Sequence, residues 1–182
     1  AGDAMWVDAI MRALEQRPAA PAWRDFPSHR VWTLFHLART VDLQPGVLFV
    51  TANLNAGGAQ RSLCNLALAL QPSLRPEIAV CGESSSEYFH QRLKQAGVAV
   101  CRTAASRDCF DHAEAVVQRA LAGGYATVCF WNADAKVKLL LVKALAATAV
   151  KLVDVSPGSY AFEEMQAVRD FQQWTAFNED EY

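Results

Sequence analysis

From Val47 onward, short apolar runs alternate with amphipathic helical patterns, and this alternation constrains the fold more than any other feature of the chain. Apolar residues recur at helical spacing between the runs, and unbroken apolar runs are typical of strands buried on both faces. The sequence therefore predicts an α/β fold, a Rossmann-like domain over residues 46–182 whose parallel sheet has helices on both faces. The predicted strands are 47–50, 77–81, 98–101, 126–131 and 150–155, with 175–178 as a last edge strand. The predicted helices are 59–70, 84–96, 111–122, 136–147 and 157–173.

Helix ends are predicted from capping residues. Residues 84–87 (Ser-Ser-Ser-Glu) match a capping box, in which a hydroxyl and a carboxylate satisfy unpaired backbone N–H groups. Residues 111–114 (Asp-His-Ala-Glu) are a second predicted helix start. Gly97 and the pair Gly123 and Gly124 are predicted to end the two helices, because glycine is common immediately after a helix.

Residues 1–45 have a different pattern. Two amphipathic stretches, 4–17 and 29–39, are separated by three prolines that break regular structure. The aromatic residues of this segment are expected to form a packing stripe. We interpret 1–45 as a helical preamble packed on the main domain, or equally as the tail of a preceding domain.

Composition excludes several classes of protein. A chain of 182 residues with 52% hydrophobic and 20% charged residues can form one folded domain. The net charge of −2 argues against a nucleic-acid binder, which needs a basic surface. The five cysteines form no Cys-x-x-Cys pair and the four histidines have no metal-ligand spacing, so reduced thiols and no metal are expected. Because neither a secretory signal nor a membrane-spanning run is visible, we expect a cytoplasmic location.

The chemistry is expected at the carboxyl ends of the strands, where ligands bind to open α/β sheets. Three loops lie there: 51–58, 131–135 and 156–160. In the first, Gly57 and Gly58 precede a helix whose free N–H groups and dipole favour anionic or hydroxyl-rich ligands. The loop matches neither the dinucleotide fingerprint nor the P-loop, so no such cofactor is expected. The alternative is that the two glycines only form a tight turn.

Residues 47–67, Val-Leu-Phe-Val-Thr-Ala-Asn-Leu-Asn-Ala-Gly-Gly-Ala-Gln-Arg-Ser-Leu-Cys-Asn-Leu-Ala, resemble the opening of group 1 (family 4) glycosyltransferases of the GT-B fold. In that family the first strand leads into a Gly-Gly-Ala-Glu-Arg loop and a leucine-rich helix. Gln60 stands where the family usually has glutamate, and Asn132 and Ser156 match positions at which it often has histidine. Contacts to the acceptor would then use neutral amide and hydroxyl groups, so a general base in this half is doubtful.

The resemblance implies the acceptor-side half of a retaining glycosyltransferase, which transfers a sugar from a nucleotide-sugar donor to a glycan or lipid-linked acceptor in bacterial surface polysaccharide synthesis. It implies no cofactor or metal, a donor site mainly on a carboxyl-terminal domain absent from this chain, and possible peripheral membrane association of the full-length enzyme. Residues 1–182 alone are expected to transfer no sugar. No catalytic residue is assigned. The expected substrate-binding residues are Asn55, Gly57, Gly58, Gln60, Asn132, Asp134, Ser156 and Ser159.

Simpler interpretations stay open for several of these residues. Asp134 can cap the following helix while Lys136 faces solvent, and residues 156–160 can also serve as a cap. At the level of the whole chain, the alternative is a non-catalytic flavodoxin-like or receiver-like module that binds a ligand or a protein. However, residues 47–53 lack the acidic cluster of a receiver, and residues 53–60 are not the Ser/Thr-rich phosphate loop of a flavin binder.

Overall fold

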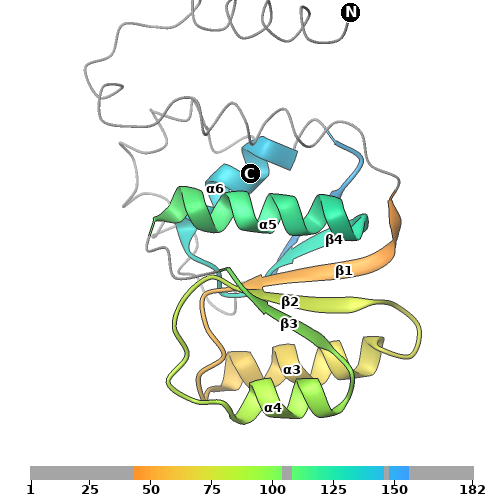
Figure 1. Cartoon of the computed structure of the whole chain (residues 1–182), viewed down its shortest axis with the longest axis vertical. Coiled ribbons are helices and arrows are strands. Elements are labelled where there is room, and N and C mark those ends of the chain that lie inside the picture. Colours follow the sequence, from red (N-terminus) through yellow and green to blue (C-terminus); the bar gives the residue numbers. More distant parts are fainter. Residues whose placement is uncertain (1–42, 104–107, 146–147, 156–182) are drawn as a thin grey trace, which may run out of the picture.

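The computed structural model describes residues 43–103, 108–145 and 148–155, within which strands and helices alternate strictly along the chain (Figure 1). In chain order they are β1 (Gln44–Thr51), α3 (Gly58–Leu70), β2 (Pro76–Val80), α4 (Tyr88–Gln95), β3 (Ala99–Arg102), α5 (Cys109–Gly123), β4 (Tyr125–Phe130), α6 (Ala135–Leu145) and β5 (Lys151–Asp154). The predicted α/β class is confirmed. The elements predicted before residue 43 and after residue 155 lie outside the described residues.

The sheet is parallel throughout, with strand order β3-β2-β1-β4-β5. The chain builds outward from β1 through β2 to β3, and then returns to place β4 on the other side of β1. Between β1 and β4 the connections therefore diverge to opposite faces of the sheet. In Rossmann-like domains ligands bind outside this switch point, at the carboxyl ends of the strands.

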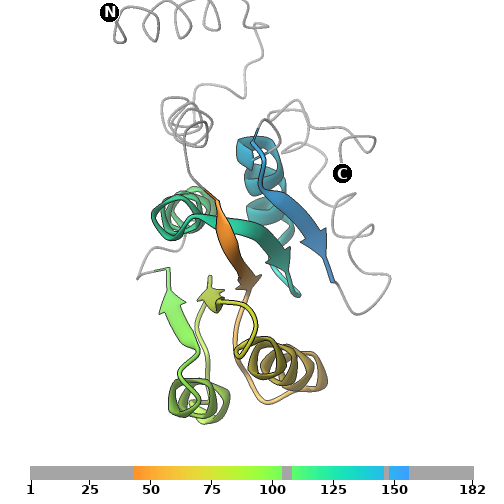
Figure 2. The same cartoon turned by 90° about the vertical axis from the view of Figure 1, so that its right-hand side faces the viewer.

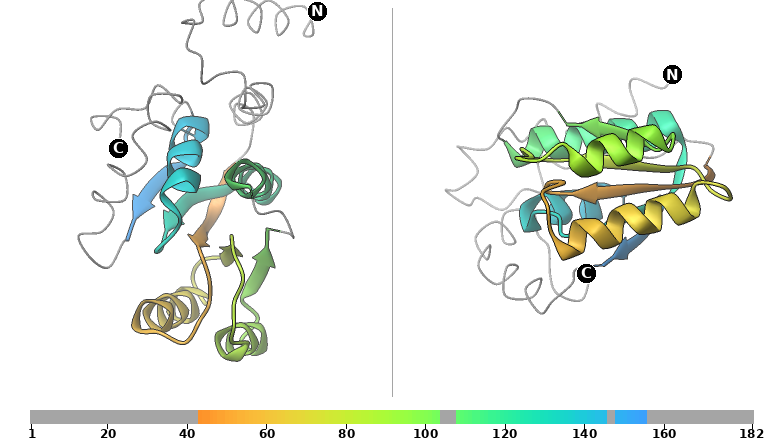
Figure 3. Two further views of the ribbon diagram at one scale, coloured as in Figure 1. Left: turned by 90° about the vertical axis from the view of Figure 1, so that its left-hand side faces the viewer. Right: turned by 90° about the horizontal axis from the view of Figure 1, so that it is seen from below.

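Helices cover both faces of the sheet, as predicted: α3 and α4 lie on one face, and α5 and α6 lie on the other (Figures 1, 2 and 3). Successive residues of β1 point to opposite faces and join two separate cores. Phe49 belongs to a buried cluster with Leu63 of α3 and Leu93 of α4. Leu48 and Val50 belong to the cluster with α5 and α6. Because both faces are buried, the strands lack polar alternation.

Strand β1 begins at Gln44, three residues before the predicted start at Val47 and two before the predicted domain boundary. Its pairing with β4 is irregular between these two residues, where Pro45 and Gly46 lie. Proline has no N–H to donate to a ladder and is tolerated in sheets at strand starts and bulges. The irregularity therefore explains how the Pro-Gly pair, predicted to precede the strand, is contained in it. The other strands begin and end within one residue of the prediction.

Two predicted helix starts are wrong. The Glu87 side chain makes no capping hydrogen bond to α4, and the Ser84 hydroxyl instead accepts a hydrogen bond from the Leu54 N–H (2.9 Å) in the loop after β1. Helix α5 begins two residues before Asp111, and the carboxylate of Asp108 accepts a hydrogen bond from the N–H of its second residue (2.8 Å). In both places a different nearby side chain caps the helix: the hydroxyl of Ser86 accepts from the N–H of Tyr88 (3.3 Å) at α4, and Asp108 serves at α5.

The predicted helix ends are confirmed. Gly97 follows α4 at φ 77°, and Gly124 caps α5 at φ 61°. Both lie in the left-handed region, which side chains other than glycine rarely adopt.

An ionic cluster around the buried carboxylate of Glu77 joins β2, α5 and β4. The carboxylate of Glu77, whose residue is only 1% exposed, accepts hydrogen bonds from the guanidinium of Arg119 and from the hydroxyl of Tyr125. Burial raises the pKa of Glu77, but the hydrogen bonds from Arg119, Tyr125 and Cys101 and the charge of Arg119 together lower it by more, so that it lies below the ordinary value of 4.5. Glu77 lies near the amino-terminal end of β2. The cluster is therefore at the amino-terminal edge of the sheet, whereas the site is expected at the carboxyl-terminal edge.

All five cysteines are free, as predicted. Burial raises the pKa of Cys81 to about 11 and that of Cys101 to about 12. The thiols are therefore protonated at neutral pH, which is typical of structural cysteines.

Candidate functional site

The loops after β1 and β4 meet at the switch point of the sheet. The N–H of Ala52 donates to the carbonyl of Asn132 (3.3 Å), and the N–H of Trp131 donates to the carbonyl of Val50 (2.8 Å). These bonds extend the ladder between the two strands beyond the last residues of β4. Two of the three loops expected to bind the ligand are thus neighbours, whereas the third loop, which contains Ser156 and Ser159, lies outside the described residues.

Trp131 fixes the start of α3 against the sheet. Its indole N–H donates to the carbonyl of Ala59 in the first turn of the helix (2.9 Å), and its ring packs edge-on against Phe49 with 6.4 Å between ring centroids. The indole is buried, so the hydrogen bond is shielded from water. The amino-terminal end of α3 is therefore held in place from β4.

The two glycines before α3 have different surroundings. Gly57 is the N-cap in an extended conformation, and a Cβ on it would lie 2.7 Å from Oε1 of Gln60. A Cβ on Gly58 would meet no atom within 4 Å, and the φ of this residue is not positive. Within the described residues, a Cβ at 57 would thus require the Gln60 side chain to shift, while neither packing nor backbone conformation requires glycine at 58. The surface at Gly58 is open to whatever approaches the helix from outside.

Gln60 faces the interior of the loop. Only 8% of the residue is exposed, and its Nε2 donates to Oδ1 of Asn53 (3.2 Å). The same Asn53 oxygen accepts the N–H of Asn55 (3.1 Å). The neutral amide of Gln60 thus stabilises the loop by a hydrogen bond to Asn53. A glutamate at position 60 could not donate this hydrogen bond. Whether Gln60 contacts a substrate stays a prediction.

Asn55 connects two loops at this edge of the sheet. Its Oδ1 accepts hydrogen bonds from the N–H (2.6 Å) and the hydroxyl (2.9 Å) of Ser85, in the loop between β2 and α4. Together with the bond between Ser84 and Leu54, these contacts tie the loop after β1 to the loop after β2. The side-chain oxygen of Asn55 is therefore engaged within the chain, and the residue contributes to the rigidity of the loop.

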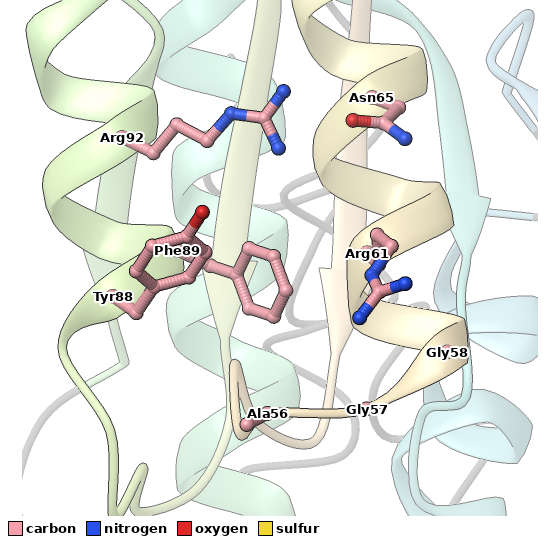
Figure 4. Close-up of a pocket in the computed structure, with 8 residues that line it drawn as sticks. All are labelled: Ala56, Gly57, Gly58, Arg61, Asn65, Tyr88, Phe89 and Arg92. Atoms are coloured by element: carbon pink, nitrogen blue, oxygen red, sulfur yellow. The ribbon is translucent and has the colours of Figure 1, made fainter.

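A groove of about 600 Å³ opens beside the glycine loop, between α3 and α4 (Figure 4). Arg61 and Asn65 lie one turn apart on α3, and Tyr88 and Arg92 lie one turn apart on α4. The side chain of Arg92 extends toward α3 (Figure 4). The lining residues are Ala56, Gly57, Gly58, Arg61, Asn65, Tyr88, Phe89 and Arg92.

The groove is positively charged on both walls. Within residues 43–103, 108–145 and 148–155, no carboxylate forms an ion pair with Arg61 or Arg92. The charge of Arg92 reaches across to α3, where Cys64 lies beneath the helix surface. Burial raises the pKa of Cys64, and Arg92 lowers it by a smaller amount. The groove therefore offers cationic donors, a carboxamide and an exposed phenol to a ligand.

Asn132 and Asp134 lie in the loop after β4 and do not line this groove. Asn132 is exposed and has a positive φ of 53°, a conformation that asparagine tolerates better than most residues. Oδ1 of Asp134 accepts hydrogen bonds from the N–H groups of Lys136 (2.9 Å) and Val137 (3.2 Å), so that Asp134 caps α6. The alternative that Asp134 serves as a helix cap is thus confirmed. Contacts of Asn132 and Asp134 with a substrate stay predictions.

The sequence analysis did not identify the four polar side chains of the groove, which are Arg61 and Asn65 on α3 and Tyr88 and Arg92 on α4. Each pair has the i, i+4 spacing that places two side chains on one helix face. This spacing was visible in the sequence, but that the two faces lie opposite each other follows from the packing of α3 beside α4.

The described part of the chain contains no group of three or more His, Cys, Asp or Glu side chains that could hold a metal ion. None of its helices combines the length and apolar character needed to cross a membrane.

These features, a glycine loop open at Gly58 and an arginine-lined groove at the carboxyl edge of a parallel sheet, describe a candidate ligand site. A comparison of the chain with models of protein families, with curated proteins and with solved structures found no match.

Proposed function

We propose that this chain is the acceptor-side half of a GT-B glycosyltransferase. In such an enzyme it would hold the accepting substrate while a second domain holds the nucleotide-sugar donor. The observation that carries the proposal is Gly58, where the first turn of α3 is left bare at the carboxyl edge of the sheet and a Cβ would meet no atom within 4 Å. The resemblance of residues 47–67 to the opening of group 1 glycosyltransferases supports the same assignment.

The chemistry assigned to this half is positioning. Unpaired N–H groups at the amino-terminal end of a helix stabilise negative charge, and here they lie beside two arginines. Neutral groups such as the Asn132 side chain, in the next loop, would orient acceptor hydroxyls without removing a proton. Proximity of donor and acceptor can supply about 7–11 kcal/mol of a reaction barrier. A loop held rigidly by Trp131, Gln60 and Asn55 suits that role.

The test is a transfer assay on the full-length gene product with Gly58→Val. Nucleoside diphosphate release from UDP-, GDP- and ADP-sugars would be measured with a panel of glycan and lipid-linked acceptors. We expect the substitution to abolish acceptor-dependent release while the melting temperature changes little, because the added side chain would occupy open space that ligands need. Ala69→Val is the control, since it adds a branched side chain to an exposed position of the same helix, away from the loop.

Normal transfer by a well-folded Gly58→Val protein would refute the role of the loop. Absence of transfer by the wild-type protein with every donor would favour the ligand- or protein-binding module.

The 182-residue chain by itself is expected to fold but to transfer no sugar, because the proposal assigns the donor site to a second domain. Calorimetric titration with the same nucleotide sugars measures this directly. Tight, stoichiometric binding of any of them would place the donor site in this half and contradict the assignment.

A further inference from the structure

The two arginines of the groove between α3 and α4 make an arrangement that folding alone does not favour. Arg61 and Arg92 line the same groove from different helices, and the described residues supply no ion-pairing carboxylate to either. Like charges brought to one groove repel each other, and the repulsion is relieved when an anion lies between them. Elsewhere on this domain arginines do have carboxylate partners: Arg102 pairs with Glu87, and Arg119 pairs with Glu77.

The surroundings of the arginines select a phosphate group among anions. Guanidinium groups bind phosphate oxygens through paired hydrogen bonds, and a doubly charged phosphate can accept from two of them at once. The amide of Asn65 lines the same wall as Arg61, and the bare first turn of α3 at Gly58 opens on the groove. A carboxylate, with two oxygens and a single charge, would leave part of this donor set unused.

An aromatic ring beside the arginines indicates that the phosphate is attached to an organic group. Tyr88 is 62% exposed, yet its ring is supported from one side by Phe89, with 5.1 Å between the ring centroids. A supported, exposed ring can pack against a sugar face or a hydrocarbon chain. It lines the groove on the same helix as Arg92, one turn away (Figure 4).

We propose that this groove binds the phosphate group of a phosphorylated acceptor, with the phosphate between Arg61 and Arg92 and the attached organic group against Tyr88. The inference rests on the proposed function, because it names the class of acceptor that the domain would hold. The glycine loop would then be the boundary between the phosphate and the reacting end of the acceptor, which would lie toward the loop after β4.

The experiment is a titration of the 182-residue chain, monitored by two-dimensional NMR of its backbone amides. The probes are inorganic phosphate, glucose 1-phosphate for a phosphorylated sugar and geranyl phosphate for a lipid-linked phosphate. Saturable shifts are expected at residues 57–61 and 88–92 with at least one organic phosphate, and inorganic phosphate is expected to bind more weakly. Arg61→Gln and Arg92→Gln should each weaken binding about tenfold, the scale of one charged hydrogen bond.

Lys94→Gln is the matched control, because it removes one positive charge from an exposed position of α4 that does not line the groove. It should leave the affinity within about twofold, since exposed charges at a distance are screened by salt. An equal loss in Lys94→Gln would reduce the effect to net charge and overturn the proposal. So would the absence of saturable shifts with all three probes, or inorganic phosphate binding as tightly as both organic phosphates.

The binding readout separates this inference from the proposed function. Transfer that depends on Gly58 but needs no phosphorylated acceptor would overturn the groove assignment alone. Arginine-dependent binding of an organic phosphate without transfer from any nucleotide sugar would overturn the glycosyltransferase assignment and leave the phosphate groove in place.

Discussion

Alanine at position 58 should stabilise this domain, and the reasoning depends only on the folded geometry. Gly58 is the first residue of α3, its φ is not positive, and a Cβ there would meet no atom within 4 Å. Replacing glycine by alanine where the native conformation suits both raises the free energy of unfolding by about 0.4–1 kcal/mol, because the unfolded chain loses conformational freedom. In a domain of this size that corresponds to a melting temperature higher by about 1–4 °C.

Gly57→Ala is the matched comparison, and its effect should have the opposite sign. A Cβ at 57 would lie 2.7 Å from Oε1 of Gln60, so the buried side chain would have to move and lose its hydrogen bond to Asn53. Alanine is also a poor N-cap compared with glycine. Together these effects should lower the free energy of unfolding by about 1–2 kcal/mol. The measurement is urea unfolding of the wild type, Gly58→Ala and Gly57→Ala, monitored by circular dichroism.

The two glycine variants also separate folding from ligand binding. If Gly58→Ala is more stable than the wild type but weakens binding of organic phosphates, the missing Cβ at 58 serves the ligand. A destabilised Gly58→Ala protein would show that something in the fold needs glycine there, and the argument from open space would be refuted. Equal stabilities of the two variants would contradict the difference between their surroundings.

Two further predictions concern groups outside the site. Because hydrogen bonds from Arg119 and Tyr125 lower the pKa of Glu77 below 4.5, its contribution to stability is complete above that pH and is lost as the pH falls through the folded-state pKa. Glu77→Gln should therefore lower the free energy of unfolding by about 2–3 kcal/mol at pH 7, with a smaller difference from wild type at pH 3, measured by urea unfolding; a difference that does not change with pH would contradict the paired carboxylate. The thiols of Cys81 and Cys101, with pKa values raised to about 11 and about 12, should react with iodoacetamide only after unfolding, as read by mass spectrometry; rapid labelling of the native protein would contradict their burial.

The sequence contains enough information for the elements but not for their order in the sheet. Apolar runs such as 126–131 predict strands because both faces of a parallel sheet are buried, and the observed bounds differ by one residue. The order β3-β2-β1-β4-β5 depends on which strands pair at long range, and no local pattern encodes it. It is this order that makes the loops after β1 and β4 neighbours.

Helix starts were predicted less well than helix ends, and the reason is physical. Gly97 and Gly124 are required by their own left-handed backbone, which is a local property. A hydroxyl such as that of Ser84 can accept from any nearby donor, and in the folded chain the N–H of Leu54, thirty residues away, is that donor. A tertiary hydrogen bond therefore engages Ser84, and the neighbouring hydroxyl of Ser86 accepts from the first N–H of α4 instead.

In the candidate site, too, local features could be predicted from the sequence, whereas features that depend on tertiary packing could not. The glycine loop could be recognised from residues 57 and 58, because it is contiguous in sequence, but which glycine is needed for packing depends on where Gln60 points. Arg61 and Arg92 come from helices separated by a strand, so their common groove appears only when α3 packs beside α4.

The contacts of the glycine loop explain how one loop can serve two neighbouring regions. Its interior is held by Gln60 and by Trp131, and its outer end is tied to the next loop by Asn55, so the backbone is rigid before any ligand arrives. Rigid donors lose little conformational entropy on binding and keep their geometry when charge develops. The open face at Gly58 is then the part of the loop that a ligand can approach without displacing a side chain. This bracing, together with an unfilled Cβ position beside two arginines, favours the proposed ligand-binding role over the alternative of a simple tight turn.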